Sequence, residues 1–398
     1  MIRYISLNNF KSFKCVETSL ANFSILVGPN NSGKSNFKRA LLFLRSLATG
    51  NTVAESLKMS CDTIFNVIYQ GEEAKSNSMD FSLIIEFNEP IKKIYHYSIN
   101  IVEENGDFFI KSENLFLSDS LEGEKQPILK NDQGKTTFKE FDKTDWSNAE
   151  FEKHKIAISQ LNDVNLHKYF LELRRFFSLM WFFDFDPEAM KEKTTYEPGR
   201  ATLYHPYGLN IAGTLYEIKQ KYPESFKSIK ERFSAIISEI NDIDVIKRDE
   251  DNSLLLLFIE KGKETPFIPS NVSDGVLRTL GIITAILSPT PPTLMFLEEV
   301  DKGIHFRRVR DIVSLLQSKM GSIDKKQMQV ILSTHNPYLL DLIKPEQLLI
   351  LERHKGETSM KRLSEMQNKM AIIKSFLDEG TPLGEIWFRG SLGGVPPA

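Results

Sequence analysis

A run near the N-terminus has the residue types and the spacing of a phosphate-binding loop, GPNNSGKS at residues 28–35. An apolar, strand-like run at 23–27 precedes this loop, and a helix-like run at 37–44 follows it. In such a strand–loop–helix unit, successive backbone N–H groups surround phosphates, and the helix N-terminus adds positive potential. The spacing predicts that Lys34 reaches the β- and γ-phosphates of a nucleotide and that the Ser35 hydroxyl holds Mg²⁺.

A second apolar run, at 293–297, ends in two carboxylates, Glu298 and Glu299. At the end of a buried strand, the first carboxylate can hold Mg²⁺ through its water shell, and the second can polarise an attacking water. Taken alone, the pair is equally typical of a solvated strand end in any α/β protein. The phosphate-binding loop upstream favours the catalytic interpretation.

A third apolar run, at 329–334, leads directly into His335. A histidine at this place can donate a hydrogen bond to a γ-phosphate and sense its loss. A packing or capping role is commoner for an isolated histidine. The position after a buried strand, downstream of the acidic pair, favours the phosphate role.

Residues 271–278 precede a helix-like run at 279–287. Ser273 is a good N-cap residue, and Gly275 permits close backbone approach. The segment is therefore either a simple helix start or a second phosphate-recognition loop. Two loops so far apart in one chain do not share one γ-phosphate, whereas loops from two facing subunits can.

The elements that must position these residues follow from hydrophobic periodicity. We expect paired short strands at 2–7 and 16–20, and an antiparallel sheet from the strand-like runs at 81–87, 95–102 and 108–110. Residues 120–150 are polar and predict loops.

Further along the chain, residues 151–185 and 208–240 have helical patterns, and 254–259 predicts a strand. From Ser273 onward, helices and strands alternate. The chain therefore predicts an α/β protein in four parts: an N-terminal part of the core (1–50), an antiparallel β insert with loops (51–150), a helical region (151–270) and a C-terminal part of the core (271–398).

Composition limits the class of protein. The chain has 398 residues, a formal net charge of −3 and two cysteines. It is long enough for two or three domains. Its near-neutral net charge gives no indication of a polyanionic partner. Its low cysteine content is typical of a protein in a reducing compartment. No signal peptide and no membrane-spanning run is apparent, so a cytoplasmic location and no membrane partner are expected.

The order of these motifs resembles the ABC-type ATPases of the SMC and RecF group. The chain looks most like the compact bacterial AAA family (AAA15-like) proteins related to the ATPase half of OLD-family nucleases. The matching segments are the opening at 5–13, Walker A at 28–35, the signature loop at 272–276, Walker B at Glu298-Glu299, the D-loop at 299–305, the switch histidine His335 and the tail at 384–390. The middle, about 50–265, is covered only loosely.

This resemblance implies an ABC-type P-loop ATPase head, a mixed sheet with flanking helices, joined to an antiparallel β subdomain and a helical subdomain. It implies ATP and Mg²⁺ as cofactors, and catalytic roles for Lys34, Glu299 and His335. The implied nucleotide-binding set is Gly28, Asn30, Asn31, Ser32, Gly33, Lys34, Ser35 and Asn36, with Ser273 and Gly275 from the facing subunit. Ser35 and Glu298 would hold the metal, joined by a glutamine for which Gln160 is the candidate and Gln70 the rival.

The resemblance also implies a homodimer, or a higher oligomer built from it, with ATP sandwiched between subunits. Glu298 replaces the usual aspartate, a change common in this subgroup. The long arms of SMC proteins and the nuclease domain of OLD proteins are missing. We therefore do not expect this chain to tether distant DNA segments or to cut nucleic acid by itself.

Two functions remain open at this point. The first is an ATP-dependent dimerisation switch that controls a separate effector protein, as in phage defence. The alternative is a RecF-type, DNA-binding ATPase of DNA repair. A cluster of basic residues favours this alternative: Lys302, Arg307, Arg308 and Arg310. Such a cluster is more often a solvated helix face. A transporter subunit is disfavoured by the antiparallel insert and by the RecF-like opening.

An aromatic cluster in the middle of the chain also has two interpretations. Its members are Phe176, Phe177, Trp181, Phe182, Phe183 and Phe185. It is either a docking face or, as such clusters more often are, part of the core.

Overall fold

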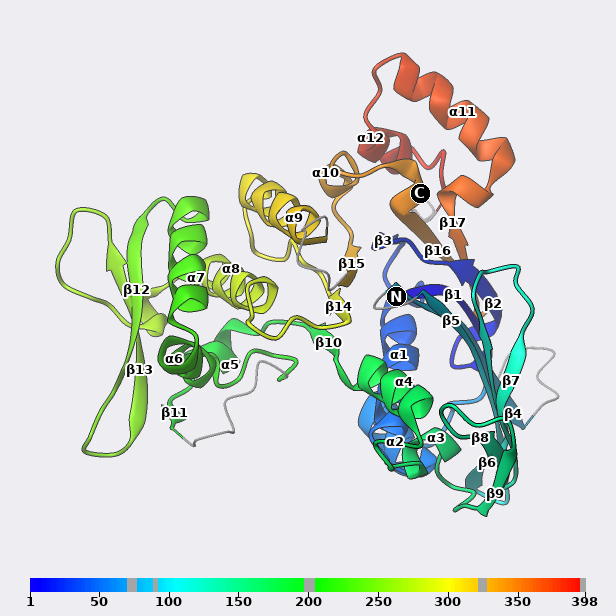
Figure 1. Cartoon of the computed structure of the whole chain (residues 1–398). Coiled ribbons are helices and arrows are strands. Elements are labelled where there is room, and N and C mark those ends of the chain that lie inside the picture. The colour runs from blue at the N-terminus through cyan, green and yellow to red at the C-terminus, as the bar shows by residue number, and fades with distance from the viewer. Residues whose placement is uncertain (70–76, 89–91, 197–204, 321–327, 394–398) are drawn as a thin grey trace. The chain divides into compact units, whose positions relative to one another are not determined.

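The computed structural model describes residues 1–69, 77–88, 92–196, 205–320 and 328–393. It forms two compact units (Figure 1). The first unit comprises Met1–Met180 with Ile343–Ala398, and the second comprises Trp181–Leu342. This partition differs from the four-part division expected from the sequence, which stays a prediction.

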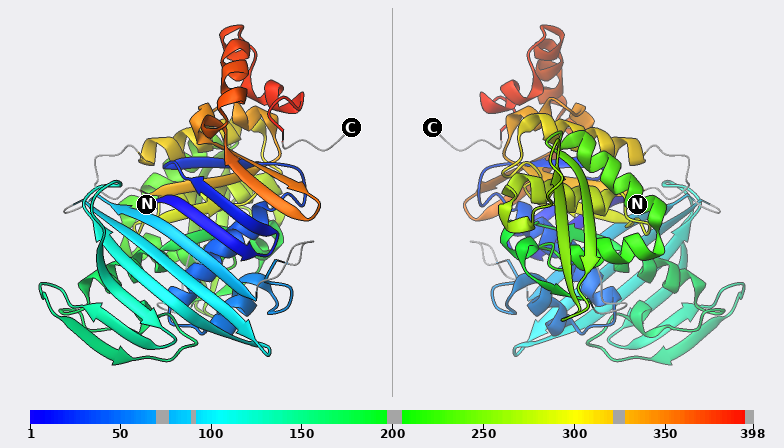
Figure 2. Two further views of the ribbon diagram at one scale, coloured as in Figure 1. Left: turned by 90° about the vertical axis from the view of Figure 1, so that its right-hand side faces the viewer. Right: turned by 90° about the vertical axis from the view of Figure 1, so that its left-hand side faces the viewer.

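The first unit contains an eight-stranded sheet in which neighbouring strands run antiparallel, in the order β2-β1-β4-β5-β6-β7-β8-β9. Figure 2 shows its long strands side by side as one curved layer. The strands are β1 (Ile2–Phe10), β2 (Phe13–Ser19), β4 (Ser78–Phe87), β5 (Lys93–Glu104), β6 (Asp107–Ser118), β7 (Gln126–Asp132), β8 (Lys135–Lys139) and β9 (Trp146–Glu150). The expected antiparallel sheet is thus confirmed.

The polar stretch at 120–150 was wrongly expected to form loops, because it contributes β7, β8 and β9. These strands are short and lie at one end of the sheet, so they need few apolar residues. A tight turn joins β7 to β8, with positive φ at Gln133 (+47°) and Gly134 (+96°). Cross-strand pairing and this turn replace the hydrophobic alternation that would have shown the strands in the sequence.

The first unit also holds the strand–loop–helix segment. Strand β3 (Phe23–Val27) leads into it, and helix α1 (Lys34–Ala48) follows it. Strand β16 (Leu348–His354) pairs parallel with β3 and antiparallel with β17 (Glu357–Arg362). The last strand, β17, was not expected from its polar sequence.

Helices pack on the antiparallel sheet of the first unit. Phe43 of α1 packs against Phe10 and Phe81 of the sheet, with ring centroids 6.2 and 5.4 Å apart. The remaining helices of this unit are α2 (Val53–Cys61), α3 (Ala157–Gln160), α4 (Lys168–Ser178), η2 (Pro345–Gln347), η3 (Leu363–Glu365), α11 (Gln367–Asp378) and α12 (Leu383–Phe388).

In the second unit, a β-layer in the order β10-β14-β15 carries the acidic pair and the histidine. Its strands are β10 (Met180–Phe183), β14 (Leu294–Leu297) and β15 (Gln329–Thr334), and β14 runs parallel to β15. The accompanying helices are α8 (Asp274–Ile286), α9 (Phe306–Met320) and α10 (Pro337–Leu340). The expected alternation of helices and strands from Ser273 onward is confirmed.

The rest of the second unit is partly helical. Helices α5 (Pro187–Lys191), α6 (Ile211–Lys221) and α7 (Pro223–Ile236) accompany η1 (Pro269–Asn271) and a three-stranded sheet, β11-β13-β12. Figure 2 shows the β12–β13 hairpin beside α6 and α7. The strands are β11 (Thr194–Thr195), β12 (Ile240–Lys247) and β13 (Ser253–Glu260). The helical region predicted for 151–270 is therefore mixed: 208–240 is helical as expected, but β10, β11 and β12 were missed.

The aromatic cluster is buried throughout: all six side chains, from Phe176 to Phe185, are at most 4% exposed. Phe182 stacks on Phe296 of β14, at 6.2 Å between ring centroids. Phe183 stacks on Phe185 at 4.8 Å. The core interpretation of this cluster is confirmed. Among the described helices, none has both the length and the apolar character needed to cross a membrane.

Candidate functional site

The glycine-rich loop of the first unit surrounds the buried ammonium group of Lys34. Lys34 is the first residue of α1 and is 8% exposed. Its ammonium group donates hydrogen bonds to the carbonyl oxygens of Gly28, at 2.7 Å, and Pro29, at 2.9 Å. No acidic residue lies in the first turn of α1. The Lys34 charge and the helix N-terminus therefore act in the same sense, and the loop suits a phosphate group.

Both motif glycines are required by close neighbours. A Cβ added to Gly28 would lie 2.3 Å from the carbonyl oxygen of Leu351, on β16. Gly33 has a φ of +110°, and an added Cβ would lie 2.7 Å from the side chain of Thr358, on β17. Any side chain at either position would displace the loop or the β16–β17 hairpin.

The β16–β17 hairpin and the β1–β2 turn also hold the loop through polar contacts. Arg353 Nη1 donates to Asn31 Oδ1 at 2.7 Å. The Ser12 hydroxyl oxygen accepts from Asn36 Nδ2 and from Thr358 Oγ1, both at 2.8 Å. Sequence reasoning missed Arg353 and Thr358, because they lie more than 300 residues from the loop and no motif marks them. Ser12 could have been found, since it lies in the opening segment that carries the family resemblance.

The other residues predicted to bind the nucleotide lie within the same loop or directly after it. Ser32 is buried, and its hydroxyl lies 3.5 Å from Lys34 Nζ. Asn30 and Ser35 are exposed, Ser35 in the first turn of α1. Phosphate-binding loops of this type use a serine or threonine hydroxyl at this position for the metal ion that accompanies the phosphate.

In the second unit, the acidic pair follows β14. The Glu298 N–H donates to the carbonyl oxygen of Phe183 at 2.8 Å. Glu299 has a φ of +45°, which is uncommon for a residue with a side chain. Its N–H donates to Ser333 Oγ at 3.1 Å. Strain of this kind gathers at functional sites, where the surrounding structure enforces it.

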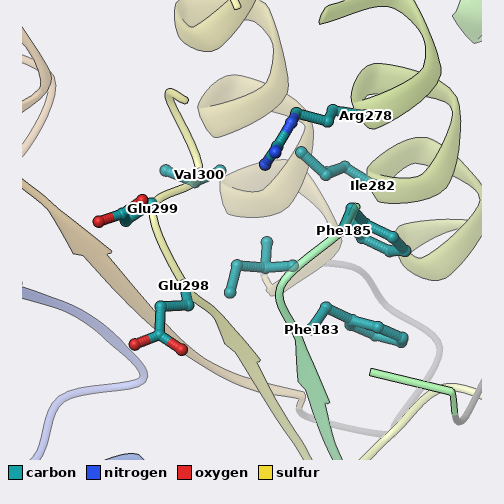
Figure 3. A pocket seen from close by; sticks show the side chains of 8 residues that line it. Phe183, Phe185, Arg278, Ile282, Glu298, Glu299 and Val300 are labelled. Atoms are coloured by element: carbon teal, nitrogen blue, oxygen red, sulfur yellow. The ribbon is translucent and has the colours of Figure 1, made fainter. Parts of the chain in front are cut away.

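Figure 3 shows the two carboxylates on the side away from Phe183 and Phe185. The pair borders a small recess lined by Phe183, Phe185, Arg278, Ile282, Leu297, Glu298, Glu299 and Val300. The guanidinium group of Arg278, on α8, extends toward Val300 in this view. Sequence reasoning did not single out Arg278. Its position five residues after Ser273 was the one sequence feature that could have indicated a place near the site.

The structure brings Glu299 and His335 together. His335 Nε2 lies 3.9 Å from Glu299 Oε1. Lys302 Nζ lies 3.5 Å from the other carboxylate oxygen of Glu299. The proposed water-activating carboxylate and the proposed phosphate sensor are thus neighbours within one unit.

Ser273 and Gly275 begin helix α8. Ser273 is exposed and occupies the N-cap position, but its hydroxyl makes no capping hydrogen bond, contrary to the expectation of a side-chain cap. Its carbonyl oxygen accepts instead from Val276 N, at 3.0 Å. Gly275 is buried, and an added Cβ would lie 2.2 Å from the carbonyl oxygen of Gly303. The close backbone approach expected at Gly275 is therefore made with the turn that follows Glu299.

Replacement of Gly275 by alanine should destabilise the protein. The added methyl group overlaps the Gly303 carbonyl, and overpacking of this kind costs about 1–3 kcal/mol in the free energy of unfolding. Urea denaturation of the full chain measures the loss. Asp274→Ala is the matched control, because the neighbouring Asp274 only forms an exposed ion pair with Lys191. Equal stability of Gly275→Ala and the parent would show that the turn moves freely.

The candidate metal-linking glutamine is engaged locally. Gln160, at the end of α3, accepts from Glu152 N at 3.1 Å and donates to the Glu152 carbonyl at 3.2 Å. Its rival, Gln70, lies outside the described residues. A metal-linking role for Gln160 stays a prediction, and it requires the side chain to leave these partners.

Comparison with known proteins then places the chain. The family model described as "AAA domain, putative AbiEii toxin, Type IV TA system" matches residues 23–341. The chain belongs to this family. The match spans the phosphate-binding loop, the acidic pair and His335.

The chain is also similar to one curated relative and to two solved structures. An ATP/GTP phosphatase of Helicobacter pylori is 21% identical over 357 residues, which cover 86% of this chain and 87% of the relative. An Smc head bound to the C-winged helix domain of ScpA is similar with a TM-score of 0.53 and 13% identity, covering 90% of this chain and 97% of that one.

A Pyrococcus furiosus Smc head with an extended coiled coil, bound to the C-terminal domain of ScpA, has a TM-score of 0.51 and 13% identity, covering 94% of this chain and 99% of that one. At these identities the likeness is one of fold. The AAA-family protein therefore has the mixed α/β fold of an ABC-type P-loop ATPase head, as expected from its motifs.

Proposed function

We propose that this protein binds ATP with Mg²⁺ and hydrolyses it to ADP and phosphate. The observation that carries the proposal is the buried ammonium group of Lys34, which lies inside a glycine-rich loop at the N-terminus of α1. Such a loop recognises the phosphates of a nucleotide. The Helicobacter pylori relative, named an ATP/GTP phosphatase, supports the same substrate class.

Each predicted residue has a distinct task in this reaction. ATP with Mg²⁺, when bound, supplies the transferable γ-phosphoryl group and an electrophilic metal. Lys34 would exchange its loop carbonyl partners for phosphate oxygens, and Ser35 and Glu298 would hold the metal. Glu299 orients the attacking water, and His335 donates a hydrogen bond to the γ-phosphate.

The proposal extends to an ATP-dependent dimer that acts as a switch. Ser273 is exposed and makes no capping bond within its own helix, so its hydroxyl is available to a nucleotide held by another subunit. Each ATP would then lie between Lys34 of one subunit and the Ser273 loop of the other. Hydrolysis would separate the subunits or change the angle between them.

The same proposal assigns the output to a separate effector protein, for example in defence against phage. The family description names a putative toxin of a toxin–antitoxin system. Both similar Smc heads were solved bound to a domain of another protein, ScpA. A compact ATPase that works through a protein partner is consistent with both observations.

Lys34→Ala tests the nucleotide site. Loss of a charge-assisted contact to phosphate should weaken ATP binding by about 10- to 100-fold. Isothermal titration with ATP and Mg²⁺ measures the affinity, and thermal denaturation of the same sample shows that the variant is folded. Lys38→Ala, one turn further along α1, is the control. Unchanged affinity in Lys34→Ala would remove the loop from the proposal.

A DNA-binding repair ATPase is the second candidate function. Lys302, Arg307 and Arg310 are exposed in the second unit. Lys302 also forms an ion pair with Glu299, and Arg308 forms one with Glu239. Three exposed cations on one turn and the helix after it can contact phosphates of a nucleic acid. Retention of the protein on DNA that falls steeply with salt would favour this function. No retention at low salt would exclude it.

A further inference from the structure

The end of strand β15 is tied to the turn after the acidic pair by two hydroxyl groups. Ser333 and Thr334 are 1% and 0% exposed. Ser333 Oγ accepts from the Glu299 N–H at 3.1 Å. Thr334 Oγ1 donates to Asp301 Oδ1 at 2.8 Å and accepts from the Asn336 N–H at 2.9 Å. His335 thus directly follows two residues whose buried hydroxyl groups are hydrogen-bonded to their neighbours.

The turn after the acidic pair is itself compact. Lys302 N donates to the Glu299 carbonyl at 2.9 Å, and Ile304 N donates to the Asp301 carbonyl at 3.1 Å. These bonds hold Asp301 and Gly303 in one short turn. The Gly303 carbonyl lies against Gly275, with room for no more than a hydrogen at that position.

A continuous chain of contacts therefore runs from His335 to the start of α8. It passes from Thr334 to Asp301 by a hydrogen bond, along the turn to Gly303, and by close packing to Gly275. Every step lies within the second unit. A contiguous chain of packed and hydrogen-bonded residues is the kind of structure that can carry coupling between two sites.

We propose that Thr334 and Asp301 form a relay that couples the phosphate-sensing His335 to the Ser273 loop, so that occupancy by a γ-phosphate sets the position of that loop for a second subunit. This inference rests on the proposed function. Thr334 is a positioning residue in it, because it acts through its hydrogen bond to Asp301. The relay differs from a merely structural bond in its consequence: its loss separates ATP binding from dimer formation.

The test replaces Thr334 by valine, which keeps the shape and removes the hydroxyl, and by serine, which keeps the hydroxyl. Both are made in the Glu299→Gln background, where ATP should be bound without turnover. We expect Thr334→Val to leave ATP affinity within about twofold and to weaken ATP-dependent dimerisation by about tenfold, a typical size for a coupling between sites. Thr334→Ser should restore dimerisation. Titration with ATP and analytical ultracentrifugation give the two quantities.

A double-variant comparison shows whether the effect passes through Asp301. The losses of dimer affinity caused by Thr334→Val and Asp301→Ala should not add. The double variant should dimerise as weakly as the weaker of the two single variants, and not more weakly. Multiplying effects, or unchanged dimerisation in Thr334→Val, would overturn the relay. A Thr334→Val protein that also loses ATP affinity would show a merely structural role and would overturn it too.

The outcomes also separate the relay from the proposed function. If the parent protein, which carries Glu299→Gln and an unchanged Thr334, binds no ATP, the proposed function itself fails. If the parent binds ATP and dimerises, but Thr334→Val does the same, only the relay fails. Hydrogen exchange at residues 299–304 and 273–277 gives an independent readout, because ATP should protect both segments in the parent and not the second segment in Thr334→Val.

Discussion

Glu299→Gln should slow ATP hydrolysis by about 100-fold or more, the usual contribution of a positioned general base, and leave ATP affinity nearly unchanged. The amide has the size of the carboxylate, so the left-handed backbone of residue 299 and its bond to Ser333 persist. The change removes only the charge that faces His335 and Lys302. Phosphate release under saturating ATP measures turnover, and equilibrium titration measures affinity.

The same variant should accumulate as a dimer when ATP and Mg²⁺ are present. Without turnover, the nucleotide that joins the two subunits is not consumed. Addition of Ser273→Arg to Glu299→Gln provides the control, because a bulky cation in the exposed loop should block the second subunit and spare ATP binding. Normal hydrolysis by Glu299→Gln would place the base elsewhere, and a dimer that survives Ser273→Arg would contradict the two-subunit site.

The parts of the candidate site that the sequence predicts are those whose chemistry depends on local spacing. A loop that surrounds phosphate needs its glycines, Lys34 and Ser35 at fixed offsets between a strand and a helix, so eight residues suffice to predict it. Gly275 was predicted as a point of close approach for the same reason. The structure adds the neighbour, the Gly303 carbonyl, which no local pattern could name.

The residues that support the loop were beyond the reach of local patterns. Thr358 and Arg353 act through a hairpin whose partner strand, β3, lies near the other end of the sequence. A long-range pairing of this kind leaves no periodic signal. The strained φ of Glu299 was hidden as well, because glutamate does not favour that conformation and only the surroundings enforce it.

The errors in the secondary structure predicted from the sequence have equally specific causes. The run Met180–Phe183 follows the amphipathic helix α4 and is apolar at every position, so periodicity could not distinguish a buried strand from a helix that continues. The opposite problem hid β9 (Trp146–Glu150), in which no side chain is buried. Such a strand is defined by its hydrogen-bonded neighbour and not by its own residues.

A buried carboxylate in the first unit leads to the second large prediction. Glu113, on β6, is fully buried and accepts hydrogen bonds from the N–H groups of Ala157 and Ile158, at the start of α3, and from the Tyr97 hydroxyl. Helix α3 carries Gln160, the candidate metal-linking residue. Burial raises the pKa of Glu113 from 4.5 to about 7, although its hydrogen-bond donors favour the charged form.

This raised pKa makes stability depend on pH in a defined window. Between pH 4.5 and about 7 the folded protein binds a proton at Glu113 that the unfolded chain has released. The free energy of unfolding therefore falls as pH rises through this window, by about 3 kcal/mol at 1.36 kcal/mol per pKa unit, and changes little from this source above it.

Glu113→Gln should abolish this contribution, because the amide is neutral in both states. We expect the variant to lose most stability relative to the parent near pH 5 and least near pH 8. Urea denaturation of both proteins at intervals between these values, followed by circular dichroism, gives the difference. Glu140→Gln is the matched control: its hydrogen bond with Lys143 lowers the pKa of Glu140, so its titration lies below the window. Parallel stability curves for Glu113→Gln and the parent would show that Glu113 stays charged when buried, stabilised by its three hydrogen-bond donors.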